Sequence, residues 1–181
     1  SQENLIVTSQ GEPELTVDNL NMAQFLYLIM DNLKLRGVID SITSKAVLIL
    51  GRFSKDRKPL LDLIKQELKR KGYLPIIYDF DGPKSRNFQE TISTIAHLSR
   101  FVIADLSDPK SVPQELMGIV PSLPSLPIQP IIAKGEEPWS MFSHIQNFPW
   151  VLDILEYQSE LDIIAALNNG LLEKIESIIK K

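Results

Sequence analysis

Cysteine is absent from the 181 residues of the sequence. Disulfides, thiolate zinc sites, iron–sulfur clusters and cysteine nucleophiles are therefore excluded. The only two histidines are His97 and His144, so a metal site built from several histidines is not expected and no metal is predicted. A chain without cysteine or a recognisable targeting signal is expected to be cytoplasmic.

Long hydrophobic runs are also missing. The most apolar N-terminal run, Met22 to Met30, is about half of the ~20 residues that a membrane-spanning helix needs. It follows an acidic, polar stretch and no basic region, so it does not resemble a signal peptide. The net charge of −4 and the pI of about 5.2 disfavour binding to a nucleic-acid backbone. Neither nucleic acid nor a membrane is therefore expected as a partner.

The chain length favours one main domain with an added N-terminal segment. Residues 1–18 are polar and are expected to form a flexible arm, in which only 5–7 could pair as a strand. Residues 19–44 are expected to form a helical extension, capped by Asp18 or Asn19, with a break at Gly37. Residues 45–181 form the main domain.

Apolar runs of strand length alternate with helical patterns through this main domain. The expected strands are 46–50, 73–79, 101–104, 128–133 and 150–155, and the expected helices are 57–71, 87–99, 111–120, 139–146 and 160–181. Such alternation predicts an α/β fold with a doubly wound, parallel five-stranded sheet, for which we expect strand order 2-1-3-4-5. Pro130 indicates a weak, bulged or edge position in the fourth strand, and Asn168–Gly170 is a candidate interruption of the last helix.

Ligands of such sheets bind beyond the carboxyl ends of the strands, where the winding reverses. The third strand ends there in Asp105, and Ser111 with Gln114 forms a candidate capping box for the next helix. Glu115 then lies in the first helical turn. A carboxylate there could attack a sugar carbon or stabilise an oxocarbenium-like transition state. The alternative is that Glu115 only complements the helix dipole.

Two further loops reach the same edge of the sheet. After the first strand, Gly51 would allow a sharp turn, and the cluster 52–57 combines Ser54 with three basic residues that could hold phosphates. This loop matches neither the Walker nor the dinucleotide-binding glycine pattern, and it could equally be a solvated basic loop. The loop Asp79–Arg86 could be a lid, a partner-binding loop or a plain surface connection.

The strand and helix segments 46–54, 73–81 and 101–115 resemble the bacterial Toll/interleukin-1 receptor (TIR)-like family, within the broader nucleoside deoxyribosyltransferase-like group. The resemblance covers about residues 45–181 and implies a flavodoxin-like fold. It also implies NAD as the substrate, no required cofactor, and Glu115 as the glutamate that cleaves the nicotinamide–ribose bond. The binding residues that it implies are Gly51, Arg52, Phe53, Ser54, Arg57, Asp79, Ser85, Arg86 and Ser111.

The sequence departs from the TIR pattern at one place. The segment before Glu115 is short and lacks the Trp or Cys that often precedes the glutamate, and it looks closer to the deoxyribosyltransferase form, in which a strand-end aspartate, here Asp105, accompanies the glutamate. The expected function is a TIR-like signalling or defence domain that hydrolyses NAD. The alternatives are a non-catalytic, self-associating interaction module and a nucleoside or nucleotide transferase. Expected partners are NAD or a related nucleotide, and further copies of this chain or other TIR-like domains.

Overall fold

The computed structural model describes residues 5–8, 14–31, 33–51, 57–79, 88–107 and 112–179. The chain divides into two compact units, Ser1–Ile42 and Thr43–Lys181. Within the described ranges, no helix is both long enough and apolar enough to cross a membrane.

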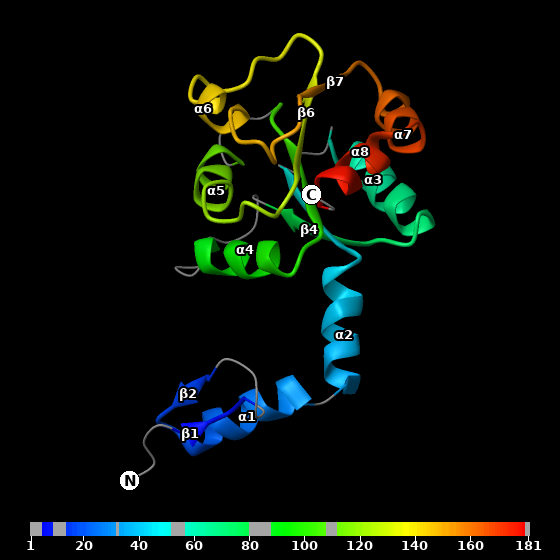
Figure 1. Ribbon diagram of the computed structural model, residues 1–181. Coiled ribbons are helices and arrows are strands. Elements are labelled where there is room, and N and C mark those ends of the chain that lie inside the picture. Colours follow the sequence, from blue (N-terminus) through cyan, green and yellow to red (C-terminus); the bar gives the residue numbers. More distant parts are fainter. Residues whose placement is uncertain are drawn as a thin grey trace. The chain divides into compact units, whose positions relative to one another are not determined.

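The N-terminal unit contains a short hairpin and helical segments. Strands β1 (Leu5–Ile6) and β2 (Thr16–Val17) pair antiparallel and lie against helix α1 (Leu20–Asp31), which is followed by α2 (Leu33–Thr43) (Figure 1). The side chain of Asn19 accepts a hydrogen bond from the Met22 N–H at 3.0 Å, so Asn19 caps α1 as expected. Gly37 lies inside α2, and the expected break there is wrong, because one glycine costs a helix only about 1 kcal/mol.

The second unit is the predicted α/β fold. Its elements are β3 (Ala46–Gly51), α3 (Lys58–Arg70), β4 (Leu74–Asp79), α4 (Phe88–His97), β5 (Phe101–Asp105), α5 (Val112–Ile119), β6 (Ile128–Ala133), α6 (Phe142–Gln146), β7 (Leu155–Tyr157), α7 (Glu160–Asn168) and α8 (Leu171–Ile179). The five strands are parallel in the order β4-β3-β5-β6-β7, which confirms the predicted 2-1-3-4-5 winding. The winding reverses between β3 and β5.

Helices cover both faces of this sheet (Figure 1). On one face, α4, α5 and α6 pack against side chains such as Val102 and Ala104 of β5. On the other face, α3, α7 and α8 pack against Phe101 and Ile103. Because side chains alternate along a strand, the side chain of Asp105 points to the α3 face, with Phe101 and Ile103.

Two helix ends of the α/β unit occur at the glycines that the sequence pattern marks. Helix α3 buries one apolar stripe and finishes in a basic turn, and Gly72 follows with φ +88°, a conformation that favours glycine. The expected terminal helix is interrupted at the candidate position, because Gly170 has φ +105° between α7 and α8. Two shorter helices therefore replace one long one.

Both prolines of the sheet lie where no backbone donor is needed. The N–H of Leu74 donates to Lys45 O at 2.8 Å, so by alternation the nitrogen of Pro75 faces the open side of edge strand β4. Pro130 lies in the interior strand β6, so an edge position is wrong. Its nitrogen faces the stretch around Asp153, where the neighbouring segment leaves the ladder. The side-chain amide of the buried Gln129 fills this gap by donating to Pro130 O at 2.7 Å and to Asp153 O at 2.9 Å.

The predicted fifth strand is displaced along the sequence. Within the expected range 150–155, Val151 forms an isolated bridge with Ile128, and the chain then leaves the ladder. Strand β7 begins only at Leu155, the last residue of that range. The displacement follows from Pro130, which offers no N–H to the neighbouring segment at this point.

Candidate functional site

Asp105 lies at the carboxyl end of β5 and is only 2% exposed. Its carboxylate lies 3.2 Å from Nη1 of Arg57, the residue that precedes α3. Ser107 donates twice to Asp105 Oδ1, from its N–H at 3.0 Å and from its hydroxyl at 2.6 Å. The buried charge is therefore balanced by one cation and two hydrogen bonds, as a buried carboxylate requires.

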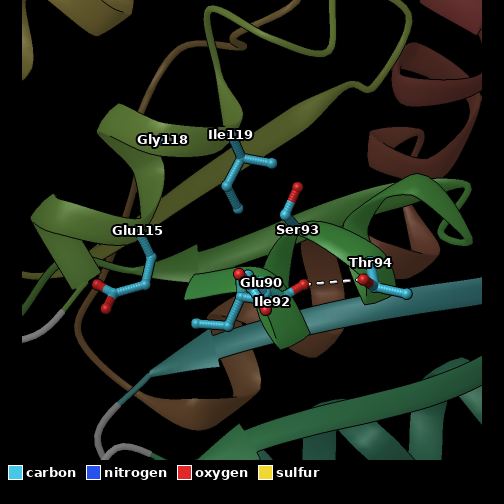
Figure 2. A pocket seen from close by; sticks show the side chains of 7 residues that line it. All are labelled: Glu90, Ile92, Ser93, Thr94, Glu115, Gly118 and Ile119. Atoms are coloured by element: carbon cyan, nitrogen blue, oxygen red, sulfur yellow. Dashed lines mark hydrogen bonds between the residues drawn. The ribbon is translucent and has the colours of Figure 1, made fainter. Parts of the chain in front are cut away.

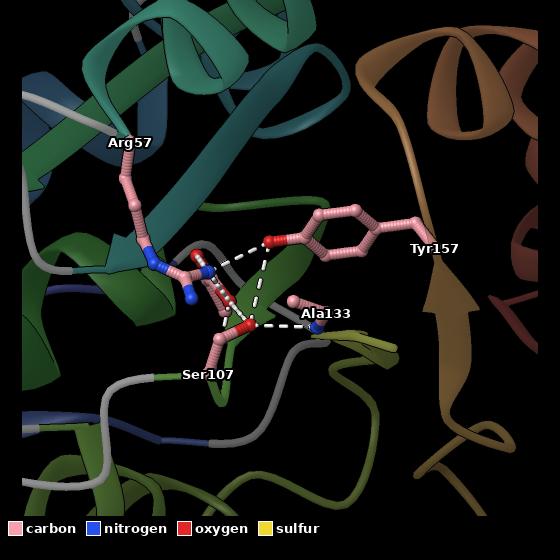
Figure 3. A network of polar contacts seen from close by, with 5 residues as sticks. Arg57, Ser107, Ala133 and Tyr157 are labelled. Carbon is pink, nitrogen blue, oxygen red and sulfur yellow. Dashed lines mark hydrogen bonds and ion pairs between the residues drawn. The ribbon is translucent and has the colours of Figure 1, made fainter. Parts of the chain in front are cut away.

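The same network extends to β6 and β7 (Figure 3). Arg57 Nη1 also donates to the Tyr157 hydroxyl at 2.8 Å, and the Ser107 hydroxyl lies 3.3 Å from that oxygen. The N–H of Ala133 donates to Ser107 Oγ at 2.8 Å. Burial raises the pKa of Tyr157, with a further contribution from the charge of Asp105. We call Arg57, Asp105, Ser107 and Tyr157 the edge network, since it joins the carboxyl ends of three strands to the start of α3.

A second group of candidate side chains lies on the other face of the sheet. Helices α4 and α5 border a cavity of about 480 Å³, and Glu115, in the first turn of α5, is one of the residues that line it (Figure 2). The other described lining residues are Glu90, Ile92, Ser93, Thr94, Gly118 and Ile119. The Thr94 hydroxyl is bound to its own helix by donating to Glu90 O at 2.8 Å. Glu115 is thus a carboxylate in the wall of a cavity near the point where the winding reverses.

Glu115 is only 6% exposed, although it carries an acidic side chain. The N-terminal end of α5 favours a negative charge in its first turn. Burial raises the pKa of Tyr78 on β4, and the charge of Glu115 raises it further, so the two groups interact through the cavity side of the sheet. A buried carboxylate at a cavity is a candidate functional group, because acidic side chains are rarely buried in folded proteins.

The two predicted catalytic residues are not brought together. Asp105 belongs to the edge network on the α3 face, whereas Glu115 lies on the α5 face. The period-2 alternation of β5 already contained this signal, since residues 101, 103 and 105 must share a face. In this structure, Asp105 therefore binds Arg57 and Ser107 at the carboxyl end of the sheet.

The predicted binding residues are described only in part. Gly51 is the last residue of β3, where a Cβ atom would lie 3.4 Å from the Asp105 Cβ, and its φ is not in the left-handed region. Arg57 is held by the edge network. Asp79 ends β4, but its side chain lies outside the described part of the chain. The others that fall outside it are Arg52, Phe53, Ser54, Ser85, Arg86 and Ser111.

Sequence reasoning missed three side chains that the structure places at these sites. Ser107 follows Asp105 by two positions, the spacing of an Asx-type turn, so a local signal existed. Tyr157 lies 100 positions from Arg57, and nothing local marks it. Tyr78 looked like an ordinary strand residue because its relation to Glu115 depends on the fold.

A smaller cavity of about 390 Å³ lies beside the edge network, at the start of α7. The Asp162 carboxylate accepts the N–H groups of Gln158 and Ser159 at 2.9 Å each. These hydrogen bonds lower the pKa of Asp162. The Asp162 carboxylate therefore already places a negative charge at the start of the helix. An anionic ligand is therefore disfavoured at this position.

No protein-family model matches the sequence, and a comparison with curated proteins finds no match. Among solved structures, a flavo di-iron protein mutant from Thermotoga maritima is similar with a TM-score of 0.57 and 17% identity, covering 83% of this chain and 40% of that one. A diflavin flavoprotein A3 from Nostoc sp. has a TM-score of 0.45 and 13% identity, covering 73% of this chain and 97% of that one.

These comparisons bear on two of the sequence-based expectations. The Thermotoga similarity supports the flavodoxin-like fold. The Thermotoga structure is a flavin protein by name, and this finding contradicts the cofactor expectation, namely that none is required and that NAD is the substrate. That expectation came from the TIR-like resemblance, and a fold of this class is common to proteins with different ligands, so the resemblance could not select one ligand. What the comparisons establish for this chain is its fold, a flavodoxin-like α/β unit.

Proposed function

We propose that the α/β unit cleaves or transfers the N-glycosidic bond of a nucleoside or nucleotide, with Glu115 as the group that acts at the sugar carbon. The observation that carries this proposal is the buried Glu115 carboxylate in the wall of the α4–α5 cavity, near the reversal of the winding. The resemblance of segment 101–115 to TIR-like and deoxyribosyltransferase-like proteins supports the same chemistry. A cytoplasmic location, expected from the cysteine-free sequence, belongs to this proposal.

The proposed reaction breaks the bond between C1′ and the base nitrogen. The base leaves with the electron pair of that bond, and positive charge develops on the sugar. The Glu115 carboxylate either bonds to C1′ or stabilises the oxocarbenium-like state. In hydrolysis, the oxygen of a water molecule then bonds to C1′, any bond between C1′ and Glu115 breaks with its electron pair returning to the carboxylate, and a proton of that water goes to the base. In transfer, the nitrogen of a second base replaces the water oxygen.

The cavity lining bears on the class of ligand. The charged side chains among its described residues are Glu90 and Glu115, both carboxylates, which would repel a phosphate group. The sugar and the base are therefore proposed to face Glu115, with any phosphate farther away. The same carboxylates do not fit a flavin phosphate, so no flavin-dependent step is assigned to this cavity.

The test incubates the purified full chain with a set of nucleosides and nucleoside monophosphates and measures the released base by chromatography. We expect release by the unaltered protein and a loss of at least ~100-fold in Glu115→Gln. The matched control is Glu67→Gln, the same substitution at a glutamate of similar burial (8% exposed) on α3, across the sheet. This variant should retain activity, because Glu67 pairs with Arg70 far from the cavity lining.

The proposal fails if no base is released from any compound, or if Glu115→Gln retains the activity. A parallel arm titrates flavin mononucleotide and follows its fluorescence. Saturable flavin binding that Glu115→Gln leaves unchanged, without base release, would replace the proposal with a flavin-binding function, in line with the names of the similar structures.

A further inference from the structure

Helix α1 of the N-terminal unit carries no charged residue from Leu20 to Met30. Several of its large apolar side chains are exposed to solvent. Those exposed to at least two fifths are Leu20, Met22, Phe25, Tyr27 and Leu28, with Phe25 at 57%. A helix with apolar side chains on this much of its surface normally lies against another element.

The unit has too little buried surface to be stable alone. Val7 is the only buried apolar residue among its described positions. The paired strands β1 and β2 have two residues each, and an isolated 12-residue helix such as α1 is marginal in water. Units of about 40 residues usually need disulfides, metals or oligomerisation, and a chain without cysteine cannot form a disulfide. Association with another chain would therefore bury the apolar surface that this unit leaves exposed.

Charge is distributed unequally about α1 in the sequence. Glu12, Glu14 and Asp18 precede the helix, and no basic residue occurs before Lys34. After Asp31, the last residue of α1, the chain carries Lys34 and Arg36, so residues 31–36 have a net charge of +1. A parallel pair of α1 helices would place acidic end against acidic end. An antiparallel pair would place the acidic end of each helix beside the basic segment of the other, and the uncharged middle could come into close contact.

We propose that the exposed face of α1 binds the α1 helix of a second copy of this chain, in an antiparallel pair about a two-fold axis near Phe25. Such an isologous contact uses the same surface on both copies. This inference does not rest on the proposed function, because it concerns a different unit of the chain. It assigns the expected self-association to α1. Most of the loop Asp79–Arg86, the other candidate partner-binding segment, lies outside the described residues.

The first test measures the mass of the full chain in solution by light scattering or sedimentation equilibrium. We expect a dimer for the unaltered protein and a monomer for the double variant Phe25→Asp with Leu28→Asp. The matched control is Leu161→Asp, an apolar residue of α7 that is 74% exposed on the other unit, and this variant should remain dimeric. Circular dichroism and thermal melting check that the α/β unit stays folded in each variant.

The second test uses the absence of cysteine, which makes any introduced thiol unique. Phe25→Cys lies near the proposed axis and should form a disulfide between two copies. Asn21→Cys, four positions along the helix and on the same face as Phe25, would lie about 12 Å from its counterpart in the antiparallel pair and should not. Because neither change adds charge, this test does not depend on the folding of the aspartate variant.

Three outcomes would overturn the inference. The first is a monomer for the unaltered chain at all concentrations from micromolar to submillimolar, which would leave another part of the same chain as the cover of α1. The second is a dimer that persists in the double aspartate variant, since the interface would then lie elsewhere. The third is equal crosslinking at positions 21 and 25, which would mean a parallel pair.

Discussion

The guanidinium of Arg57 lies 3.2 Å from the carboxylate of Asp105, although 48 positions separate the two residues in the sequence. The pair joins the start of α3 to the end of β5 on the side of the sheet away from Glu115. Its role is therefore to position the sheet edge, and changes there should alter stability before they alter any chemistry at Glu115.

Removing the cation should cost more stability than removing both charges. Arg57→Met leaves the Asp105 carboxylate buried with Ser107 as its one remaining hydrogen-bond partner among the described residues, and it should lower the free energy of unfolding by about 3 kcal/mol. Adding Asp105→Asn to that variant should recover part of the loss. Urea unfolding of the two single variants and the double variant measures the coupling, and strictly additive effects would contradict the pairing.

Tyr73 should make the protein sensitive to alkaline pH. Its hydroxyl donates to Glu176 at 3.1 Å, and burial, followed by the charge of Glu176, raises its pKa to about 12. Because the pKa of an unfolded tyrosine is about 10, the folded state holds this proton more tightly. The resulting stability is present below pH ~10 and is lost as the pH rises toward 12. Thermal melting of Tyr73→Phe over this range should show a shallower decline than the unaltered protein.

Glu115→Gln should stabilise the fold while it removes function. Glutamine keeps the shape of the buried side chain without the cost of burying a charge, so we expect the free energy of unfolding to rise by about 1 kcal/mol near neutral pH. The pKa of Tyr78 should also fall, because the charge of Glu115 contributes to raising it. Denaturant unfolding and NMR titration of labelled tyrosine check these effects, and a marked loss of stability would instead indicate a structural role.

Gly51→Ala should be tolerated. The added Cβ would lie 3.4 Å from the Asp105 Cβ and 3.7 Å from Leu61, which are ordinary contacts, so the free energy of unfolding should change by less than about 1 kcal/mol. Gly72→Ala is the contrasting variant. It meets no atom within 4 Å, but its φ of +88° should cost about 1 kcal/mol. If Gly51→Ala proved the more damaging change, a tight turn at Gly51 would be indicated after all.

The sequence was sufficient for features that depend on local pattern. The apolar runs predicted the strands around Leu48 and Val102, and the glycine at position 170 marked the real interruption of the terminal helix. Pro130 was misjudged because its nitrogen faces a gap in the ladder that Gln129 fills, and a single strand cannot reveal what its neighbour does. Tyr157 was missed for the same reason, since its partners come from distant segments.

In the candidate site, too, some features could be predicted from local sequence pattern and others depended on the fold. Glu115 could be chosen from the spacing between a strand and a helix start, and the structure places it at a cavity. The separation of Asp105 from Glu115 followed from the alternation of β5, but the chain-order proximity of the two carboxylates favoured the opposite conclusion. Local spacing predicts which element carries a residue, whereas the face of the sheet decides what that residue can reach.

Pro75 has a consequence for how this molecule can aggregate. Edge strand β4 presents a proline nitrogen on its open side, and the opposite edge strand, β7, is only three residues long. A strand from another molecule would find few donors in register at either border, so growth of the sheet from chain to chain is discouraged. On partial unfolding, we would therefore expect the α/β unit to resist fibril formation for longer than a flavodoxin-like sheet with two long, proline-free borders.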